Sequence, residues 1–200
     1  MVSVPDEGNS DEPLDIGIEL AITTIASPTT TLAGFGFVNQ SITIPPLRDS
    51  RMTLECDLES PHQNILGRPV DFSMYYALGH YHDLGTGITV HAVRADGTND
   101  LMFATATRVG DSLGGPLEPA FSLAGYTKLR FSCDFHNDRT TSVRWGYGEK
   151  EMCAVLAFVD SERNWSGGAL TYNVTPTTVD HGTYVESTYA CTVLVSEATL

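Results

Sequence analysis

The stretch RMTLECDLE (residues 51–59) decides the fold class, because its apolar and polar residues alternate strictly. In an extended chain, Met52, Leu54, Cys56 and Leu58 share one face, while the intervening polar residues share the other. This period of two residues predicts a half-buried β-strand.

Similar patterns recur along the chain, whereas helical periodicity is almost absent. Further strands are predicted over residues 16–25, 35–44, 72–82, 88–94, 101–108, 128–135, 151–159 and 183–195. Turn signals separate them, at Gly85-Thr86-Gly87, at Asp96-Gly97, and in a loop through Gly114-Gly115-Pro116 and Glu118-Pro119. Eight or more short strands joined by turns predict an all-β fold, an antiparallel β-sandwich or jelly roll.

Domain organisation follows from length and composition. The chain has 200 residues and no internal repeat or composition break after residue 15, so we expect one domain over residues 16–200. Residues 1–15 are acidic and contain glycine and proline, which predicts a disordered leader. No signal peptide is visible, and we expect that a natural signal or lipid-anchor segment was removed before Met1.

The charge balance excludes two classes of partner. A formal net charge of −14 repels phosphate backbones and anionic lipid surfaces, which argues against nucleic acid and membrane surfaces. No run of about 18 apolar residues is present, so no segment is expected to span a membrane.

The four cysteines, Cys56, Cys133, Cys153 and Cys191, lie far apart and form no C-x-x-C pair. This spacing argues against a zinc knuckle or a redox dithiol. An even number of cysteines in an acidic, β-rich chain favours two disulfides and an oxidising location, secreted, periplasmic or at the cell surface. Four buried thiols in a cytosolic protein are the alternative, and spacing alone leaves three disulfide connectivities open.

Candidate metal ligands begin with Gly79-His80-Tyr81-His82. Two histidines at positions i and i+2 of a strand point to the same face, so their imidazoles can converge on one ion. By itself the pattern is weak, and it is more typical of two partly exposed histidines at a strand end. Met152 opens a second apolar strand, where a methionine usually fills core space.

Further motifs follow the histidine pair in a definite order. They are Leu84-Gly85, Val93-Arg94 with Asp96-Gly97, Cys133 before Asn137-Asp138-Arg139-Thr140, the glycine-containing segment 146–148, and Glu151-Met152-Cys153. With these motifs, the stretch from Gly79 to Val159 resembles the C-terminal domain of the copper type II, ascorbate-dependent monooxygenases. Peptidylglycine α-hydroxylating monooxygenase and dopamine β-monooxygenase are the familiar members of that family.

The resemblance implies a copper site. In that family two histidines and a methionine bind the copper that activates oxygen, which implies one ion per chain held by His80, His82 and Met152. Imidazole suits both copper oxidation states and a thioether favours Cu(I), so the donor chemistry agrees. Such a set leaves coordination positions open for oxygen or another small exogenous ligand, and it assigns no catalytic group beyond the ligands. The resemblance also implies the disulfides Cys133–Cys153 and Cys56–Cys191.

The chain departs from the catalytic members in two respects. Those enzymes carry a preceding domain with a second copper held by three histidines, whereas residues 1–78 contain only His62. The peptide-hydroxylating enzyme anchors its substrate through an arginine, an asparagine and a tyrosine, and the matching positions here hold Leu78, Ala154 and Leu156. A leucine cannot clamp a carboxylate as an arginine does.

The sequence therefore favours an extracytoplasmic, mononuclear copper-binding protein. The first alternative is a copper-dependent monooxygenase, or its oxygen-activating half, that draws electrons from an external donor. The second alternative is a metal-free structural or adhesion sandwich.

Overall fold

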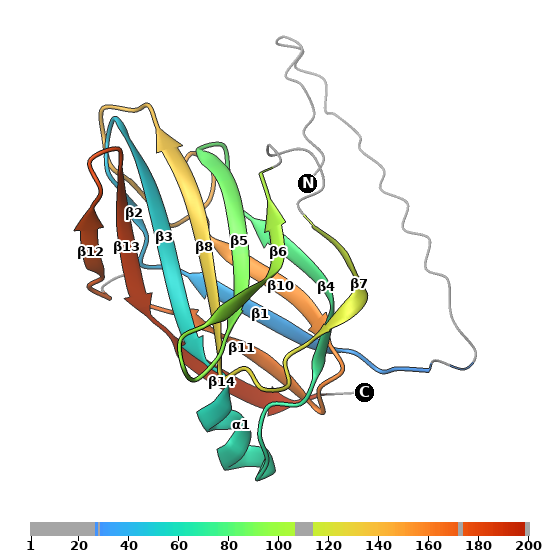
Figure 1. Cartoon of the computed structure of the whole chain (residues 1–200). Coiled ribbons are helices and arrows are strands. Elements are labelled where there is room, and N and C mark those ends of the chain that lie inside the picture. The colour runs from blue at the N-terminus through green and yellow to red at the C-terminus, as the bar shows by residue number, and fades with distance from the viewer. Residues whose placement is uncertain (1–26, 28, 107–113, 172–173, 199–200) are drawn as a thin grey trace, which may run out of the picture.

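Two six-stranded sheets pack face to face in the computed structural model, which describes residues 27, 29–106, 114–171 and 174–198 (Figure 1). The sheet that we call the front sheet, which is the farther of the two from the viewer in Figure 1, has the order β14 (Thr192–Glu197), β11 (Arg163–Ala169), β1 (Ala33–Asn39), β10 (Ala154–Val159), β4 (Ser73–His80) and β7 (Gly114–Ser122). The back sheet has the order β12 (Thr177–Asp180), β13 (Tyr184–Ala190), β3 (Arg48–Asp57), β8 (Lys128–Asn137), β5 (Gly85–Val93) and β6 (Asn99–Thr105). The predicted all-β sandwich is confirmed, with two parallel strand pairs, β1 with β11 and β3 with β13, among antiparallel ones.

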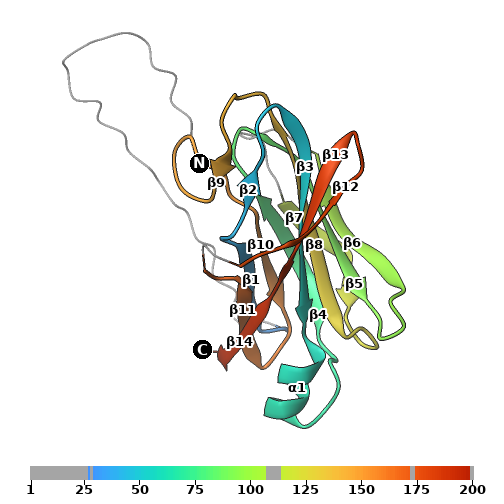
Figure 2. The ribbon, with the colours of Figure 1, turned by 90° about the vertical axis from the view of Figure 1, so that its left-hand side faces the viewer.

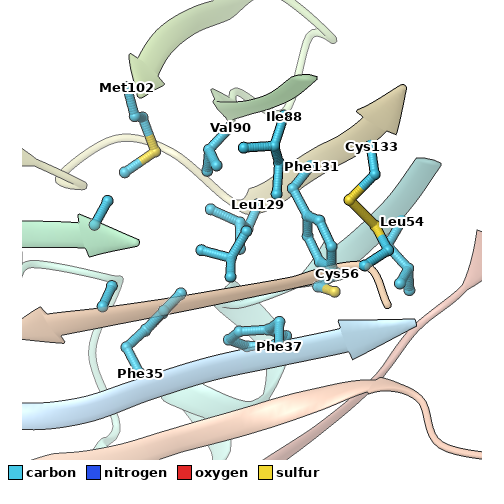
Figure 3. Close-up of a cluster of buried hydrophobic side chains, with 14 of the residues drawn as sticks. Phe35, Phe37, Leu54, Cys56, Ile88, Val90, Met102, Leu129, Phe131 and Cys133 are labelled. Carbon is cyan, nitrogen blue, oxygen red and sulfur yellow. A yellow bond between two sulfur atoms is a disulfide. The ribbon is translucent and has the colours of Figure 1, made fainter. Parts of the chain in front are cut away.

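The core lies between the sheets. Figure 2 shows the layers from the side, with β1, β10 and β11 in one layer and β3, β5 and β6 in the other. Phe35 and Phe37 project from β1 toward Leu129 and Phe131 of β8, and all four side chains are buried (Figure 3). These inward residues alternate with outward ones along each strand, because the side chains of a strand point to opposite faces in turn.

Two disulfides join the sheets at different places, and both pairings implied by the family resemblance are confirmed. Cys133 of β8 is bonded to Cys153, which directly precedes β10. Cys56 of β3 is bonded to Cys191, which lies between β13 and β14. There are no free cysteines in the described part of the chain, which agrees with an oxidising location.

Several strand boundaries differ from the prediction. The expected strand over 183–195 is two strands, since the chain leaves the back sheet after β13 and enters the front sheet as β14 at Cys191. The expected strand over 35–44 is β1 followed by β2 (Thr43–Ile44), and β2 pairs with β9 (Val143–Arg144). Patterns of alternation cannot reveal where a chain changes sheets, because the alternation continues across the change.

Two predicted turns belong to strands instead. The expected loop around Pro116 and Pro119 is the edge strand β7, where a missing backbone N–H can face away from the sheet. Gly85, expected in a turn, begins β5, and the register shifts between Gly85 and Gly87. A turn assignment from glycine and proline alone was therefore wrong at these positions.

The structure also contains a helix that the sequence pattern did not indicate. Helix α1 (Glu59–Leu66) follows β3 and ends at Gly67, whose φ of 70° suits glycine. The helix has only 8 residues, too few for a helical period to stand out. Strands β11 and β12 were likewise not predicted.

Some of the predicted segments lie outside the residues that the structure describes. The leader over 1–15 and the strand over 16–25 lie outside the described residues, and the extent of one domain over 16–200 stays a prediction. In the described ranges, no helix combines the length and the apolar character that a membrane crossing requires.

Candidate metal centre

The candidate ligands lie at one end of two neighbouring strands of the front sheet. Strands β4 and β10 pair antiparallel, with His80 opposite Ala154 and Leu78 opposite Leu156. Ala77 and Gly79 are buried against the core, whereas Leu78 and His80 are half-buried. The alternation therefore places the His80 side chain on the outer face of the front sheet, at the end of β4.

Tyr81 fixes the orientation of the two histidines on either side of it. Its ring is 1% exposed and packs against Gly85, where an added Cβ would overlap the ring. Because the middle residue of the triplet points inward, its two neighbours point away from the core. The need for this close approach explains why glycine occupies position 85 at the start of β5.

The structure brings the two imidazoles together. The ring centroids of His80 and His82 lie 5.3 Å apart, with an angle of 83° between the ring planes. The Nδ1–H of His82 donates to the carbonyl oxygen of Lys150 at 2.7 Å, which leaves Nε2 as the nitrogen with a free lone pair. Metal-binding histidines commonly donate their second ring N–H to a carbonyl or carboxylate in this way.

A buried carboxylate holds this turn against the segment that carries Met152. Glu151 is 1% exposed, and its Oε2 and Oε1 accept the backbone N–H groups of His82 at 2.8 Å and Leu84 at 2.7 Å. The N–H of Met152 also donates to Oε2, at 3.3 Å. Burial raises the pKa of the Glu151 carboxyl, while the N–H groups of Leu84 and His82 act against that shift. Glu151 therefore braces the histidine turn from the neighbouring segment.

His80 is suited to metal binding by its protonation state. Burial lowers its pKa below the ordinary 6.5, and the neighbouring His82 lowers it further. A neutral imidazole is the form that binds a metal, so this ring is available without loss of a proton at neutral pH.

Met152 lies next to the histidine pair along the sheet. It precedes Cys153, whose carbonyl accepts the N–H of Asn39 at 2.9 Å and so continues the alignment of β1 with β10. Its side chain is 8% exposed, and its position has the same parity as Ala154 and Leu156. In the described part of the chain, the contacts of the two imidazoles are with each other and with the Lys150 carbonyl, so the role of Met152 as third ligand stays a prediction.

The donor set limits which metals could bind here. In the described ranges, no group of three or more histidine, cysteine, aspartate or glutamate side chains is placed to hold a metal ion. A centre at this place would therefore consist of two imidazoles with a thioether or an exogenous ligand. Structural zinc sites usually have four protein ligands drawn from cysteine, histidine and carboxylates, so this donor set fits copper better than zinc.

Three of the four remaining histidines, His62, His136 and His181, have local contacts of their own. His62 is buried, its Nδ1–H donates to the carbonyl of Arg68, and its ring stacks on Trp165. His136 bonds to Asp49, and His181 lies 3.3 Å from a carboxylate oxygen of Glu186.

Sequence reasoning missed the role of Glu151. The residue was part of a quoted motif, but nothing in the pattern showed that its carboxylate is buried and bound by amides from the histidine turn. The only available signal was an acidic residue at the start of an otherwise apolar strand.

No protein-family model matches the chain, and no curated protein matches it either. The positions where the family resemblance would place substrate anchors are Leu78, Ala154 and Leu156, and all three lie on the outer face beside His80. None of them can form an ion pair, so the surface next to the candidate centre differs chemically from the one that grips a peptide carboxylate.

Proposed function

We propose that the chain is an extracytoplasmic, mononuclear copper-binding protein whose ion is held by His80, His82 and Met152. The observation that carries this proposal is the pair of neighbouring imidazoles, with Nδ1 of His82 engaged by the Lys150 carbonyl. The ordered motifs shared with the copper type II monooxygenases support copper, and the two disulfides support an oxidising location.

Copper suits this donor set in both oxidation states. Two imidazoles bind Cu(I) and Cu(II), and a thioether adds preference for the softer Cu(I). The brace from Glu151 and the disulfide at Cys153 hold both ligand segments in place before the ion arrives. Because these segments are already ordered, copper binding costs less conformational entropy, and the affinity is higher.

A copper-dependent monooxygenase that uses an external electron donor is the second candidate. Both histidines are only half-buried, so oxygen or another small molecule can reach them from the outer face. Oxygen consumption that requires both copper and a reductant, and that stops in His80→Ala, would favour this candidate over a protein that only binds copper.

Metal analysis after copper loading tests the proposal. We expect one copper per chain, X-ray absorption with a sulfur scatterer, and loss of binding in His80→Ala and His82→Ala. His136→Ala is the matched control, because that exposed histidine bonds to Asp49 away from the centre. Unchanged stoichiometry in the double variant His80→Ala, His82→Ala would overturn the proposal, and an unaltered chain that binds no copper would favour a metal-free sandwich.

A further inference from the structure

An apolar groove runs over the outer face of the front sheet, beside the candidate centre. It encloses about 410 Å³ and lies over β1, β4 and β10. The side chains and glycines that shape it are Tyr76, Leu78, Leu156, Phe158, Gly34 and Gly36. Side chains of Leu156 and Phe158 are 51% and 52% exposed, which leaves a large apolar surface in contact with water.

The strand register connects this groove to the histidines. Tyr76 pairs with Phe158, Leu78 with Leu156, and His80 with Ala154, so three successive rows cross β4 and β10 on the same face. Rows two residues apart are separated by roughly 7 Å along a strand. The Leu78–Leu156 row is therefore the direct neighbour of the row that holds His80.

Glycines on β1 hollow out one side of the groove. Gly36 pairs with Leu156 and Gly34 with Phe158, so the two apolar side chains stand beside positions without a side chain. An added Cβ at Gly36 would lie 3.2 Å from Cδ2 of Leu156, which would narrow this space. The surface is thus a groove between side chains and not a flat apolar sheet.

The lining excludes charged ligands. Among the described residues, no charged side chain lines the groove, and the lining amide of Asn164 accepts the N–H of Gly34 at 2.8 Å and donates to the carbonyl of Glu197. An anion would be repelled by a chain of net charge −14, and a cation would lose hydration without gaining a carboxylate partner in the lining. The groove accordingly suits an uncharged molecule.

We propose that this groove binds a small, uncharged, apolar molecule, aromatic or aliphatic, whose metal-coordinating end reaches the copper. Its volume lies within the range of roughly 300–1,000 Å³ that is common for small-molecule sites. Coordination of the copper by this molecule rests on the function proposed above, whereas the binding of an apolar molecule in the groove does not. The groove thereby determines which exogenous ligands reach the ion.

A pair of probes measures the contribution of the groove. Imidazole and 4-phenylimidazole both coordinate Cu(II), and they differ by one uncharged phenyl ring. We expect the copper-loaded protein to bind 4-phenylimidazole roughly 10- to 100-fold more tightly, because the ring leaves water for an apolar surface. Electron paramagnetic resonance titration of the Cu(II) signal gives both dissociation constants, and equal constants would overturn the proposal.

Variants assign the difference to the groove. In the double variant Leu156→Ser, Phe158→Ser, the preference for 4-phenylimidazole should disappear, while the affinity for imidazole stays unchanged. Leu101→Ser is the matched control, since Leu101 is 55% exposed on β6 of the back sheet, and it should keep the full preference. If the double variant still prefers 4-phenylimidazole to imidazole, the phenyl ring binds outside the groove, and the proposal is overturned.

Experiments on copper-free protein test the groove independently of the proposed copper site. N-phenyl-1-naphthylamine, an uncharged probe, should become fluorescent on binding, and the double variant should abolish this signal. The sulfonated analogue 8-anilinonaphthalene-1-sulfonate should bind at least 10-fold more weakly to the same chain. Fluorescence that appears only as the chain dimerises in sedimentation would mean that a second copy forms the site, and would overturn the proposal.

Discussion

The outer faces of the two sheets differ in how their side chains are partnered. On the back sheet, Arg51 donates two hydrogen bonds to Asp134 at 2.7 and 2.9 Å, and Glu55 accepts from Lys128 and Arg130. On the front sheet, the corresponding surface carries half-exposed apolar side chains and two neighbouring imidazoles. These charged groups of the back face are paired with one another, whereas the front face presents an uncharged, apolar surface to a ligand.

Strand register produces this difference. Arg51 lies opposite Asp134, and Glu55 lies opposite Arg130, so cross-strand neighbours on the back sheet have opposite charges. On the front sheet, Leu78 lies opposite Leu156 and Tyr76 opposite Phe158, with the rings of the second pair 6.2 Å apart. One sandwich thus has a face with paired charges and a face suited to ligand binding.

Removing the disulfides should give the largest effects and separate stability from copper binding. In the chain-entropy treatment, the Cys56–Cys191 bond spans 135 residues and is worth about 5 kcal/mol, against about 3 kcal/mol for the 20-residue Cys133–Cys153 span. Urea unfolding should show the larger loss for Cys56→Ser, Cys191→Ser. Copper affinity should fall more in Cys133→Ser, Cys153→Ser, because that bond adjoins Met152. The reverse order of copper losses would argue against Met152 as a ligand.

The two cysteine pairs also show what the sequence could predict. The alternation in residues 51–59 predicted the centre of β3, because every second residue faces a core. The pairing of cysteines came from resemblance to a family, and the structure confirms it. The change of sheet at Cys191 and the edge strand β7 escaped prediction, since each depends on neighbours that are distant in the chain.

The site was predictable only in part, for a similar reason. The i, i+2 spacing of His80 and His82 predicted neighbouring rings, which the structure contains. Glu151 bonds to backbone groups 67 and 69 residues away, and backbone N–H groups leave no trace in a sequence. Motif patterns therefore located the ligands but not the residue that braces them.

The next prediction compares a carboxylate of the histidine turn, Glu151, with a carboxylate of the back sheet, Glu55. In Glu151→Gln, one side-chain oxygen is replaced by an amide that cannot accept, so a buried N–H loses its acceptor at a cost of about 1–3 kcal/mol. Glu55→Gln on the back sheet weakens partly exposed ion pairs and should cost less than about 1 kcal/mol. Urea unfolding measures both losses.

Copper titration of the same variants gives the second readout. Affinity should fall in Glu151→Gln, because the histidine turn is held less firmly, and stay unchanged in Glu55→Gln. Equal effects of the two variants on copper would contradict a specific role of Glu151 as the brace.

Two buried methionines, Met152 just before β10 and Met102 on β6, give a smaller contrast. Met152→Ile should weaken Cu(I) more than Cu(II), since only the thioether favours the softer ion. Met102→Ile, in β6 of the back sheet, removes a sulfur of similar burial and should change neither affinity. Competition with chelators specific for each oxidation state measures both constants. Equal losses for Cu(I) and Cu(II) in Met152→Ile would count against the sulfur as a ligand.

The smallest predicted contrast concerns two histidines in different settings. The pKa of His80 lies below 6.5 because of burial and of His82, whereas the pKa of His136 lies above 6.5 because it bonds to Asp49. In copper-free protein, proton NMR of the ring Hε1 signals should show His136 gaining its proton at higher pH than His80. The reverse order would contradict the burial of His80.

These shifts fix the direction of each pH effect. As the pH falls below about 6.5, the unfolded chain protonates His80 before the folded chain does, so its contribution to stability is lost toward acid. For His136 the contribution is present below about 6.5 and is lost as the pH rises through its raised pKa.

The affinity for copper should also depend on pH. Protons compete with copper for the two imidazoles, so copper affinity should decline below about pH 6. An affinity that stays flat from about pH 7 to 4.5 would contradict a centre built on two histidines, because both rings must lose their protons to bind.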